Sequence, residues 1–486
     1  MSAVVVSTAA LAWPSLSTWR ADLVASLRAG RRLVTLYGRA DPHKQVTLTA
    51  VLDDDDDGLR LSRTTVGGDD VYHPLSGDFP ALSCFEREIH EQTGLPMPGH
   101  PWLKPLRYEG QDQAAMRTHP FYKIEGKEVH EVAVGPIHAG VIEPGSFRFQ
   151  CLGEQVHHLE IQLGYQHRGA EGRLLRGDPR RQVPLVETVA GDTSVAWAWA
   201  WCAAVEALSG CVVAADVDLA RAIALELERV AMHLSGLSGL CADIGFLQGA
   251  TTYGRLRTTA INTTMRLCGS RFGRGAVRLG TPGLRLPAAI LPDVDAALAL
   301  LRSDLAIIND HFLTARTVQH RLKDTAVLTQ EHARALGVVG MAARSSGSAI
   351  DARQRRRGDV WQRHPIAAAL FHNGDCFDRA RLRIAEIDAS LAWLKAVTQR
   401  PLNDAPGPPV SPLRPDSVVV AVVEGWRGEV VHVLETGSAG ELVHCKVQDP
   451  SLRNWMAVAV ATRGNEISDF PICNKSFDLS YCGNDL

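Results

Sequence analysis

The sequence predicts an α+β protein, in which a small N-terminal α/β domain precedes a mainly helical domain with a β-hairpin start and a small C-terminal β-containing region. Three observations support this class. Residues 30–75 alternate apolar and polar side chains with the two-residue period of β-strands. Residues 216–245 instead have apolar residues at three- and four-residue spacing, which is typical of helices. Alternation returns after residue 416, and we therefore expect domains at 1–115 and 125–486.

Composition excludes several classes of protein. The chain has 486 residues and a formal charge of −3, with 51 Lys+Arg against 54 Asp+Glu, so it has no general electrostatic attraction for nucleic acid. Its ten cysteines are scattered, and no two have the C-x-x-C spacing of zinc or iron–sulfur sites. We expect a reducing, cytoplasmic location, no signal peptide and no membrane-spanning segment.

The N-terminal domain is predicted from short alternating segments and one helix. The strings RLVTLYGRA, VTLTAVL and LRLSRTTV indicate a small antiparallel sheet. The acidic run Asp53–Asp57 between two of them favours a solvated turn over a metal loop, because adjacent carboxylates point in different directions and repel each other. FEREIHE then predicts a helix that Gly94 can end, and the polar segment 109–129 forms the domain boundary.

The second domain begins with a predicted β-hairpin at 130–163. Its loop is rich in turn-forming residues, namely Gly135, Pro136, Gly140, Pro144 and Gly145. His138 lies inside this loop among small residues. Two interpretations fit the histidine: it caps the turn, or it is a polar group presented into a cavity between subunits.

Helices dominate the following residues as far as 397. We expect helices at 194–209, 216–245 and 374–397, and a helical pair within 290–335. The arginine-rich segment 251–284 is predicted to form a solvated or subunit-docking face. A proline-rich connector at 398–416 leads to the strand-like segments SVVVAVVEGWRGEVVHVLET and ELVHCKVQDPS.

Several motifs follow one another in an order that resembles the large-subunit family shared by energy-converting nickel–iron hydrogenases (formate hydrogenlyase and hydrogenase-4 types) and the 49-kDa-type subunit of respiratory complex I. They are GPIHAGVIEPGSFRF, LGYQHRGAEGRLLRG, ETVAGDTSVAWAWAW, GVVGMAARSSGSAIDAR, EGWRGEVVH and DFPICNKSFDLSYCGNDL. Phe-Glu-Arg-Glu at 85–88 and Gly-His-Pro at 99–101 are similar to the 30-kDa-type subunit of complex I, which some relatives fuse to the large subunit. The resemblance covers residues 80–486 and implies that family's fold.

The resemblance also implies a site. His138 corresponds to the histidine that points into the quinone site of complex I, and Asp243 to an aspartate that hydrogen-bonds it. Glu171 corresponds to a glutamate that relays protons beside the metal of hydrogenases, where a dry cleft would raise its pKa. Its other interpretation is a carboxylate at a helix N-terminus. The cavity-lining residues that the resemblance implies are Gly135, Gly191, Asp192, Arg344, Asp351, Arg353 and Asp478, with the basic run 353–357 at the rim.

The nickel ligands of the family are missing. The R-x-C-G-x-C motif of hydrogenases falls on residues 188–193, and the closing D-P-C-x-x-C-T-D-R motif on residues 478–486. The four cysteine positions hold Ala190, Thr193, Ser480 and Gly483. A nickel–iron centre needs soft thiolates, so the resemblance implies a metal-free variant that binds no cofactor by itself. Quinone would lie at a subunit interface, although Gly191 or Asp192 replaces the tyrosine that bonds quinone in complex I.

Two hypotheses for function follow. In the first, the chain is a subunit of a membrane-associated, complex-I-like oxidoreductase, beside an iron–sulfur small subunit, a ferredoxin-like subunit and antiporter-like membrane subunits that hold it on the inner face of the cell membrane. In the second, it is a non-redox structural subunit that couples conformational change to ion-translocating partners. Cluster-binding cysteines in a partner chain from the same operon would favour the first. A working hydrogenase is the third and least favoured hypothesis.

Overall fold

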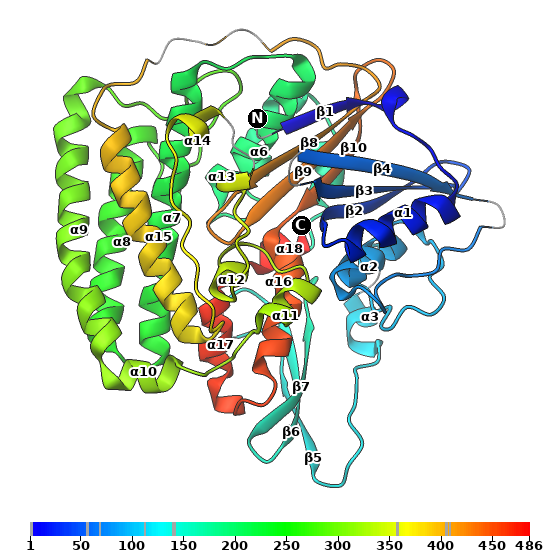
Figure 1. The fold of residues 1–486 in the computed structure, drawn as a ribbon, viewed down its shortest axis with the longest axis horizontal. Helices are drawn as coiled ribbons and strands as arrows, with labels where there is room; N and C mark the ends of the chain where they lie inside the picture. The colour runs from blue at the N-terminus through cyan, green and yellow to red at the C-terminus, as the bar shows by residue number, and fades with distance from the viewer. Residues whose placement is uncertain are drawn as a thin grey trace.

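The computed structural model describes residues 3–54, 58–67, 70–110, 113–138, 142–355, 359–403, 407 and 410–486. Residues 55–57 of the acidic run, Gly140 and residues 356–357 of the basic run lie outside the described residues. The chain combines helices and antiparallel sheets, as predicted, with a group of long helices beside three sheets (Figure 1).

The predicted N-terminal sheet is confirmed. Strands β2 (Arg32–Ala40), β3 (Val46–Asp54) and β4 (Gly58–Val66) form an antiparallel sheet in that order. Helix α1 (Leu16–Arg28) packs on β4, and α2 (Ser83–Thr93) packs on β2. Helix α2 is the predicted FEREIHE helix, and it ends at Gly94, whose φ of 71° is the left-handed conformation that glycine adopts without strain.

A second sheet joins the two ends of the chain. Its order is β1-β8-β9-β10, and β1 (Ala3–Ser7) pairs antiparallel with β8 (Ser417–Glu424). Strands β9 (Glu429–Thr436) and β10 (Leu442–Gln448) complete it, which confirms the predicted C-terminal strands. In Figure 1, β1 lies beside β8, far from it in sequence. The first strand therefore belongs to the C-terminal sheet, whereas a boundary near residue 115 would place it in the N-terminal domain.

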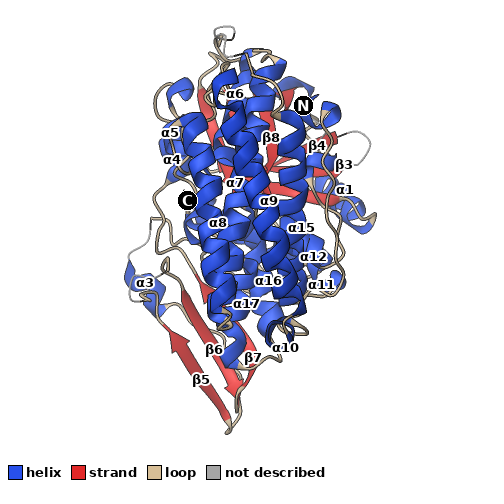
Figure 2. Cartoon of the chain, turned by 90° about the vertical axis from the view of Figure 1, so that its left-hand side faces the viewer, coloured by secondary structure: helices blue, strands red, loops and turns tan. Residues whose placement is uncertain are grey.

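The predicted hairpin forms a third, three-stranded sheet. Its strands β5 (Val129–Val134), β6 (Ser146–Leu152) and β7 (Gln155–Gln162) pair antiparallel in sequence order. The sheet projects below the rest of the molecule (Figures 1 and 2). Helix α16 (Pro450–Thr462) packs on β7 and anchors the sheet to the C-terminal region.

Long helices form the other side of the molecule. Helix α7 (Ala215–Asp243) packs against α8 (Leu247–Cys268) and α15 (Cys376–Val397), and both α8 and α15 contact α9 (Leu291–Thr314). Figure 2 shows these helices side by side. Helices α7, α9 and α15 confirm the predicted helical segments. Helix α8 was not predicted as a helix, because Thr, Arg and Gly residues interrupt its apolar pattern.

Helix α6 (Ser194–Ser209) is enclosed on several sides. It lies between β8 and β9 on one side and α5 and α7 on the other. Trp197, Trp199 and Trp201 are all buried, although they alternate in sequence as a strand would. A helix that is surrounded on several sides buries residues all round, so strand-like spacing of tryptophans does not contradict a helix here.

Short elements complete the fold. They are η1 (Thr8–Ala10), η2 (Pro80–Leu82), α3 (Gln113–Thr118), α4 (Ala170–Leu174), η3 (Pro179–Arg181), α5 (Val183–Val186), η4 (Ala288–Ile290), α10 (Arg316–Leu322), α11 (Gln330–Ala335), α12 (Gly340–Ser345), α13 (Ala352–Arg355), α14 (Asp359–Arg363), η5 (Ile467–Asp469), α17 (Phe470–Phe477) and α18 (Tyr481–Asp485). Within the described ranges, no helix has both the length and the hydropathy that a membrane span requires.

Candidate functional site

The candidate site lies where the start of α6, the β8–β9 turn, the C-terminal tail and the hairpin loop meet. Arg427, in the turn, connects two of these segments. Its Nη1 and Nη2 donate to Asp192 Oδ1 and Oδ2 at 2.7 and 2.6 Å, and its Nε donates to the carbonyl oxygen of Asp478 at 2.5 Å. The backbone N–H of Tyr481 donates to Glu143 Oε2 at 3.3 Å, which connects the tail to the hairpin. The structure thus brings the predicted residues Asp192 and Asp478 together.

The Arg427–Asp192 pair is fixed from several directions. The guanidinium lies 3.9 Å above the Trp426 ring, and Trp426 Nε1 donates to the carbonyl of Asp192 at 3.0 Å. Arg427 Nη1 also donates to Thr193 Oγ1 at 3.2 Å. Burial opposes the charge of Arg427, but Asp192 and Asp478 keep its pKa raised, so the guanidinium stays charged. Its side chain is buried, whereas that of Asp192 is 38% exposed, so the pair faces solvent on its carboxylate side.

A second arginine connects the two segments that hold the missing cysteine positions. Arg168 donates to the carbonyl oxygens of Thr188 at 2.8 Å and Val189 at 3.0 Å, before α6. The same side chain donates to the carbonyl of Cys482 at 3.3 Å in the tail. Segments 188–193 and 478–485, which hold the two cysteine-lacking motifs, are therefore neighbours in space.

Asp449 occupies the space beside Gly483. A Cβ atom built on Gly483 would lie 2.4 Å from Asp449 Oδ2 and 2.9 Å from Ser480 Oγ. The carboxylate is fixed there as the N-cap of α16, where it accepts the N–H of Ser451 at 2.8 Å. Burial raises the pKa of Asp449, and the nearby Arg427 opposes that shift. A side chain at position 483 would therefore require Asp449 to move.

His138 is half-buried, and it makes no hydrogen bond to Asp243. Its Nε2 hydrogen-bonds the carbonyl oxygen of Gly145 at 2.8 Å, across its own loop, and its ring lies 6.0 Å from that of Phe147. Asp243 is exposed at the end of α7, where partial desolvation raises the pKa of its carboxyl and Lys475 opposes the shift. No hydrogen bond joins the two side chains among the described residues, so the expected His138–Asp243 pair is absent.

Glu171 is an ion-pair partner, not a carboxyl with a raised pKa. Its Oε1 accepts from Lys446 Nζ at 2.9 Å and from the N–H of Val447 at 2.8 Å, and its Oε2 accepts from Gln92 at 3.0 Å. Burial alone would raise the pKa of Glu171, but Lys446 and Arg107 lower it to about 2. The expectation of a raised pKa is wrong, because the cleft supplies two cations. Its position in the first turn of α4 agrees with the helix N-terminal interpretation.

Arg344, Asp351 and Arg353 form a buried ion-pair network with residues of α7, α15 and β8. Arg344 donates to Glu386 at 2.7 and 2.9 Å and to Glu424 at 2.7 Å. Arg353 donates to Asp351 Oδ1 and Oδ2 at 3.0 and 2.7 Å. The side chains are at most 2% exposed, so they do not line an open cavity as predicted. They form the support behind the turn that carries Arg427.

The same network continues into α7. Arg353 and Arg229 both bond Glu226, and His233 Nε2 lies 2.7 Å from Glu386 Oε2. Three arginines therefore face four carboxylates. Burial and Asp351 raise the pKa of Glu424 to about 7, so this carboxyl binds a proton near neutral pH and offsets the excess negative charge.

The glycines of the site have different roles. A Cβ on Gly340 would lie 1.9 Å from the carbonyl oxygen of Arg427, and its φ is +66°. The glycine-rich loop thus contacts the β8–β9 turn through backbone atoms that only glycine permits. Gly191 precedes Asp192, and its carbonyl oxygen accepts a hydrogen bond from the Ser194 hydroxyl at 3.0 Å. Gly135 lies exposed in the hairpin loop, where a Cβ atom would meet open space.

Comparisons with known proteins agree on one family. Residues 243–408 match the family described as "Respiratory-chain NADH dehydrogenase, 49 Kd subunit". The chain is 28% identical over 355 residues to the carbon monoxide-induced hydrogenase of Rhodospirillum rubrum, covering 72% of this chain and 97% of that protein. It is 28% identical over 439 residues to hydrogenase-4 component G of Escherichia coli, covering 84% and 74%. A component of the NADH-quinone oxidoreductase of Dehalococcoides mccartyi is 29% identical over 355 residues, covering 71% and 95%.

The chain is similar over most of its length to the large subunits of complex I and related hydrogenases. A solved structure agrees with this fold: a chain of the membrane-bound sulfane sulfur reductase, an archaeal respiratory membrane complex, superposes with a TM-score of 0.68. It is 20% identical and covers 75% of this chain and 100% of that one. The predicted family and fold class are confirmed.

The residues of this protein do not fit a nickel–iron centre. Ala190 and Gly483 provide no ligand atom, and Thr193 Oγ1 accepts a hydrogen bond from Arg427. The Arg427 guanidinium is a fixed cation beside these positions, where it would repel a metal ion. Within the described ranges, no group of three or more His, Cys, Asp or Glu side chains is arranged to hold a metal ion.

Three charged residues of the site were missed from the sequence. Glu228, in α7, accepts the N–H groups of Val195 and Ala196 at 2.8 and 3.4 Å, at the start of α6. Arg383 is fully buried near Asp478, and its Nε and Nη2 have no hydrogen-bond partner among the described residues. Asp449 was predicted only as a residue near the end of the strand-like segment ELVHCKVQDPS, with no role in the site. A charged residue inside an apolar helical segment was the available signal for Glu228 and Arg383.

Proposed function

We propose that this large subunit belongs to a membrane-associated, complex-I-like or hydrogenase-4-like oxidoreductase, in which it forms the acceptor side of a quinone cavity beside an iron–sulfur partner and holds no nickel–iron centre. The observation that carries the proposal is the replacement of the thiolate positions by an arginine–carboxylate cluster. Arg427 and Asp192 form a bidentate pair there, and Asp449 takes the space beside Gly483. Relatives named as hydrogenase and NADH-quinone oxidoreductase subunits support membership of such a complex.

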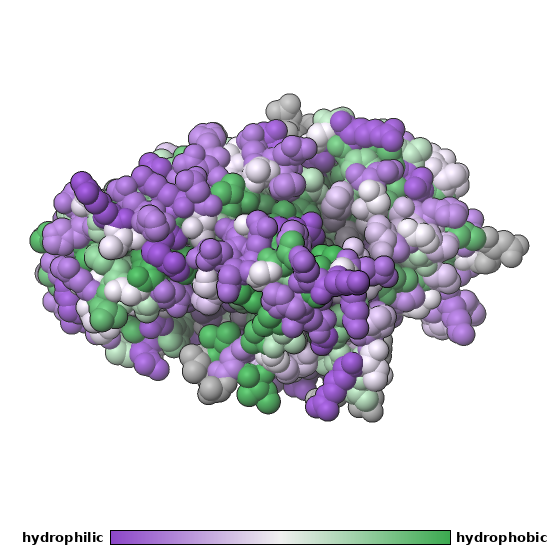
Figure 3. Space-filling model, turned by 90° about the horizontal axis from the view of Figure 1, so that it is seen from below, coloured by the Kyte–Doolittle hydropathy of each residue, from purple (hydrophilic) through white to green (hydrophobic). Residues whose placement is uncertain are grey.

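The hairpin loop supports a partner-facing role. Ile137 is 85% exposed beside His138, and Ile142 on the other side of the loop is also exposed. Exposed apolar side chains of this kind are typical of surfaces that partners cover. Seen from below, the surface is mainly hydrophilic, with hydrophobic residues in separate patches (Figure 3). An iron–sulfur small subunit, a ferredoxin-like subunit and antiporter-like membrane subunits are the proposed partners, with the complex on the inner face of the cell membrane.

His138 is the residue that we assign to proton transfer. A bound quinone would supply two-electron chemistry that consumes protons at its oxygens. The Gly145 carbonyl holds His138 Nε2, which leaves Nδ1 without a partner among the described residues. An imidazole nitrogen in that position can donate or accept a proton. Glu171 stays ionised near neutral pH and orders the cleft, while Asp243 is exposed and makes no hydrogen bond to the histidine among the described residues.

The test is quinone-linked turnover of the assembled complex. His138→Ala should reduce turnover by about 10²-fold, the usual effect of losing a general acid. His130→Ala is the matched control, because His130 lies exposed on strand β5 of the same hairpin sheet. Unchanged turnover in a correctly assembled His138→Ala complex would contradict the assignment.

The buried network favours a second function, the coupling of conformational change to ion translocation without redox chemistry. Glu424 has a pKa of about 7 and lies between Arg344 and the N–H of Ala352, so its proton can leave near neutral pH. Glu424→Gln should then lower ion transport in vesicles, whereas His138→Ala should leave it unchanged. Normal ion transport in Glu424→Gln together with lowered transport in His138→Ala would support the redox function.

A further inference from the structure

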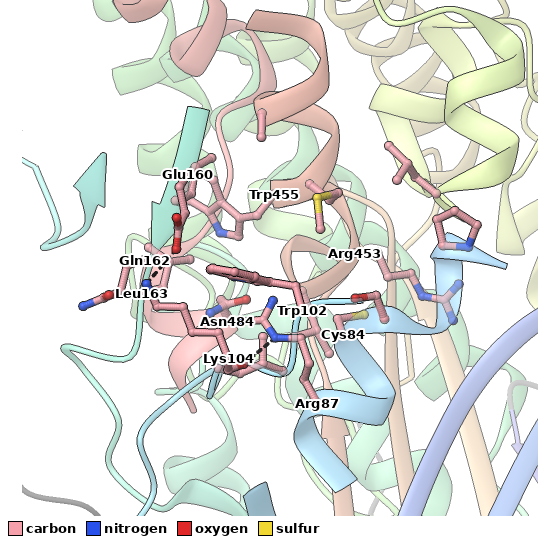
Figure 4. Close-up of a pocket in the computed structure, with 18 of the residues that line it drawn as sticks. Cys84, Arg87, Trp102, Lys104, Glu160, Gln162, Leu163, Arg453, Trp455 and Asn484 are labelled. Carbon is pink, nitrogen blue, oxygen red and sulfur yellow. Dashed lines mark hydrogen bonds and ion pairs between the residues drawn. The ribbon is translucent and has the colours of Figure 1, made fainter. Parts of the chain in front are cut away.

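A cavity of about 530 Å³ lies between the N-terminal unit (residues 1–115) and the large-subunit domain, and Asn484 of the C-terminal tail is part of its wall (Figure 4). Its walls come from α2, the segment 101–106, strand β7 and helix α16. None of the residues that we assign to the quinone side lines it. The volume falls within the range of about 300–1,000 Å³ that is common for small-molecule sites.

Most of the cavity wall is apolar. Trp102, from the N-terminal unit, and Trp455, from α16, both line it, and both are labelled in Figure 4. Tyr122 and Met456 also line the cavity and are 48% and 43% exposed, so they mark its open side. The remaining apolar lining residues include Leu106, Leu159, Ile161, Leu163, Leu336 and Ala459. Such a wall suits the hydrocarbon part of a ligand.

The charged residues of the wall are mainly cations. Lys104 is paired with Glu160 at 2.6 Å, so these two charges offset each other. Arg87 donates only to the carbonyl oxygens of Lys104 and Pro105, and Arg453 only to backbone carbonyls of other segments. Neither guanidinium has a carboxylate partner among the described residues. Glu91 and Glu160 act on Arg87 and Glu429 acts on Arg453 only at longer range, so within the described part of the chain the wall carries two guanidiniums without an ion-pair partner.

The two guanidiniums act on one region of the cavity. Both Arg453 and Arg87 lower the pKa of the Cys84 thiol, although burial outweighs them and raises it to about 11. Cys84 lines the cavity and is labelled between them in Figure 4. Arg453 Nε has no hydrogen-bond partner, and burial lowers the pKa of Arg453 to about 10. A buried cation without a counter-ion is unfavourable, and an anion beside it would remove that penalty.

We propose that this cavity binds an amphipathic monoanion, whose head group lies at Arg87 and Arg453 and whose hydrocarbon chain lies along Trp102 and Trp455. A carboxylate or phosphate ester head matches guanidinium donors in charge and geometry. A medium-length alkyl chain matches the apolar wall. This ligand site is separate from the proposed redox function and does not depend on it.

Calorimetric titration of the purified complex with decanoate, decyl phosphate and decanol tests the proposal. The two anions should bind at least about tenfold more tightly than the alcohol, because a charged hydrogen bond contributes that much. Tighter binding of decyl phosphate than of decanoate would identify a phosphate ester as the natural head group, and the reverse a free carboxylate. Equal binding of anions and alcohol, or no binding of any of them, would overturn the proposal.

Two variants locate the bound ligand. Arg87→Gln should remove most of the preference for decanoate over decanol. Met456→Trp should weaken decanoate binding about tenfold or more by narrowing the open side. Met265→Trp is the matched control, because Met265 has the same exposed fraction of 43% but lies on α8. Equal effects of the two tryptophan variants, or an unaltered preference in Arg87→Gln, would place the ligand elsewhere and refute the assignment.

Discussion

Glu228 is a buried carboxyl whose pKa differs strongly from its usual value. It lies in the middle of α7 and accepts two backbone N–H groups from the first turn of α6. Burial raises the pKa of Glu228 to about 8, and the negative charge of Asp192 contributes to the shift. Near neutral pH the carboxyl therefore holds a proton, close enough to Asp192 for the two groups to interact electrostatically. The unfolded chain would release that proton at a pKa of 4.5.

This difference predicts a pH dependence of stability. Because the folded protein binds a proton that the unfolded chain has lost, the free energy of unfolding should fall as pH rises from about 5 to 8, by up to about 1.4 kcal/mol per pH unit. Glu228→Gln should remove that part of the fall in urea unfolding at several pH values. Glu331→Gln, at an exposed carboxylate of α11, serves as the control. An equal slope in wild type and Glu228→Gln would show that Glu228 is ionised in the folded protein.

Arg344 is the residue on which the buried network depends most. Arg344→Met removes the cation that Glu386 and Glu424 share and leaves two buried carboxylates poorly compensated. The free energy of unfolding should fall by about 3–5 kcal/mol. Arg255→Met breaks an ion pair of similar geometry, with Asp304, but Arg255 is 56% exposed, so its effect should stay below about 1 kcal/mol. The free energies of unfolding are measured by urea unfolding. Similar losses in Arg344→Met and Arg255→Met would contradict the claim that burial makes the Arg344 ion pairs more important for stability.

At the scale of elements, the contact between the glycine-rich loop and the β8–β9 turn positions Arg427. Gly340 has a positive φ and no room for a Cβ beside the Arg427 carbonyl. Gly340→Ala should therefore shift the turn, lower stability and weaken the Arg427–Asp192 pair. Gly172→Ala, in α4 with open space around it, is the matched control and should be neutral. A crystal structure of Gly340→Ala with an unmoved Arg427 would contradict this coupling.

Elements with a strong local pattern could be predicted from the sequence. Helix α7 has regular apolar spacing over its length, and strands β2 to β4 alternate clearly. Helix α8 was missed because its buried face is made of Gly, Ala and Thr as well as Leu, which dilutes the apolar period. The pairing of β1 with β8 links residues more than 400 positions apart, and no local pattern specifies such a contact.

At the scale of the whole molecule, buried charges tie the N-terminal unit to the rest. Lys446 of β10 pairs with both Glu88 of α2 and Glu171 of α4, at 2.6 and 2.9 Å. Arg32 of β2 similarly bonds Glu429 of β9 at 2.7 Å. The N-terminal unit is therefore an integral part of the fold, and the cavity at its junction is built by both parts.

The candidate site could be predicted only in part. Motif order identified the segments that meet at Arg427, and Asp192 and Asp478 do lie there. The roles of individual carboxylates were less accessible, because a pKa depends on neighbours that are remote in sequence. Lys446 lies 275 residues from Glu171 and lowers its pKa, while the partner expected for His138 is exposed at the end of α7.

Metal analysis of the natively purified complex tests most directly whether the arginine–carboxylate cluster has replaced the nickel–iron centre. Nickel should be far below one atom per large subunit, because Ala190 and Gly483 offer no ligand and Arg427 places a cation beside them. Electron paramagnetic resonance on the same sample should show signals only from iron–sulfur clusters of partner subunits. About one nickel atom per chain after native purification would contradict the proposed metal-free large subunit.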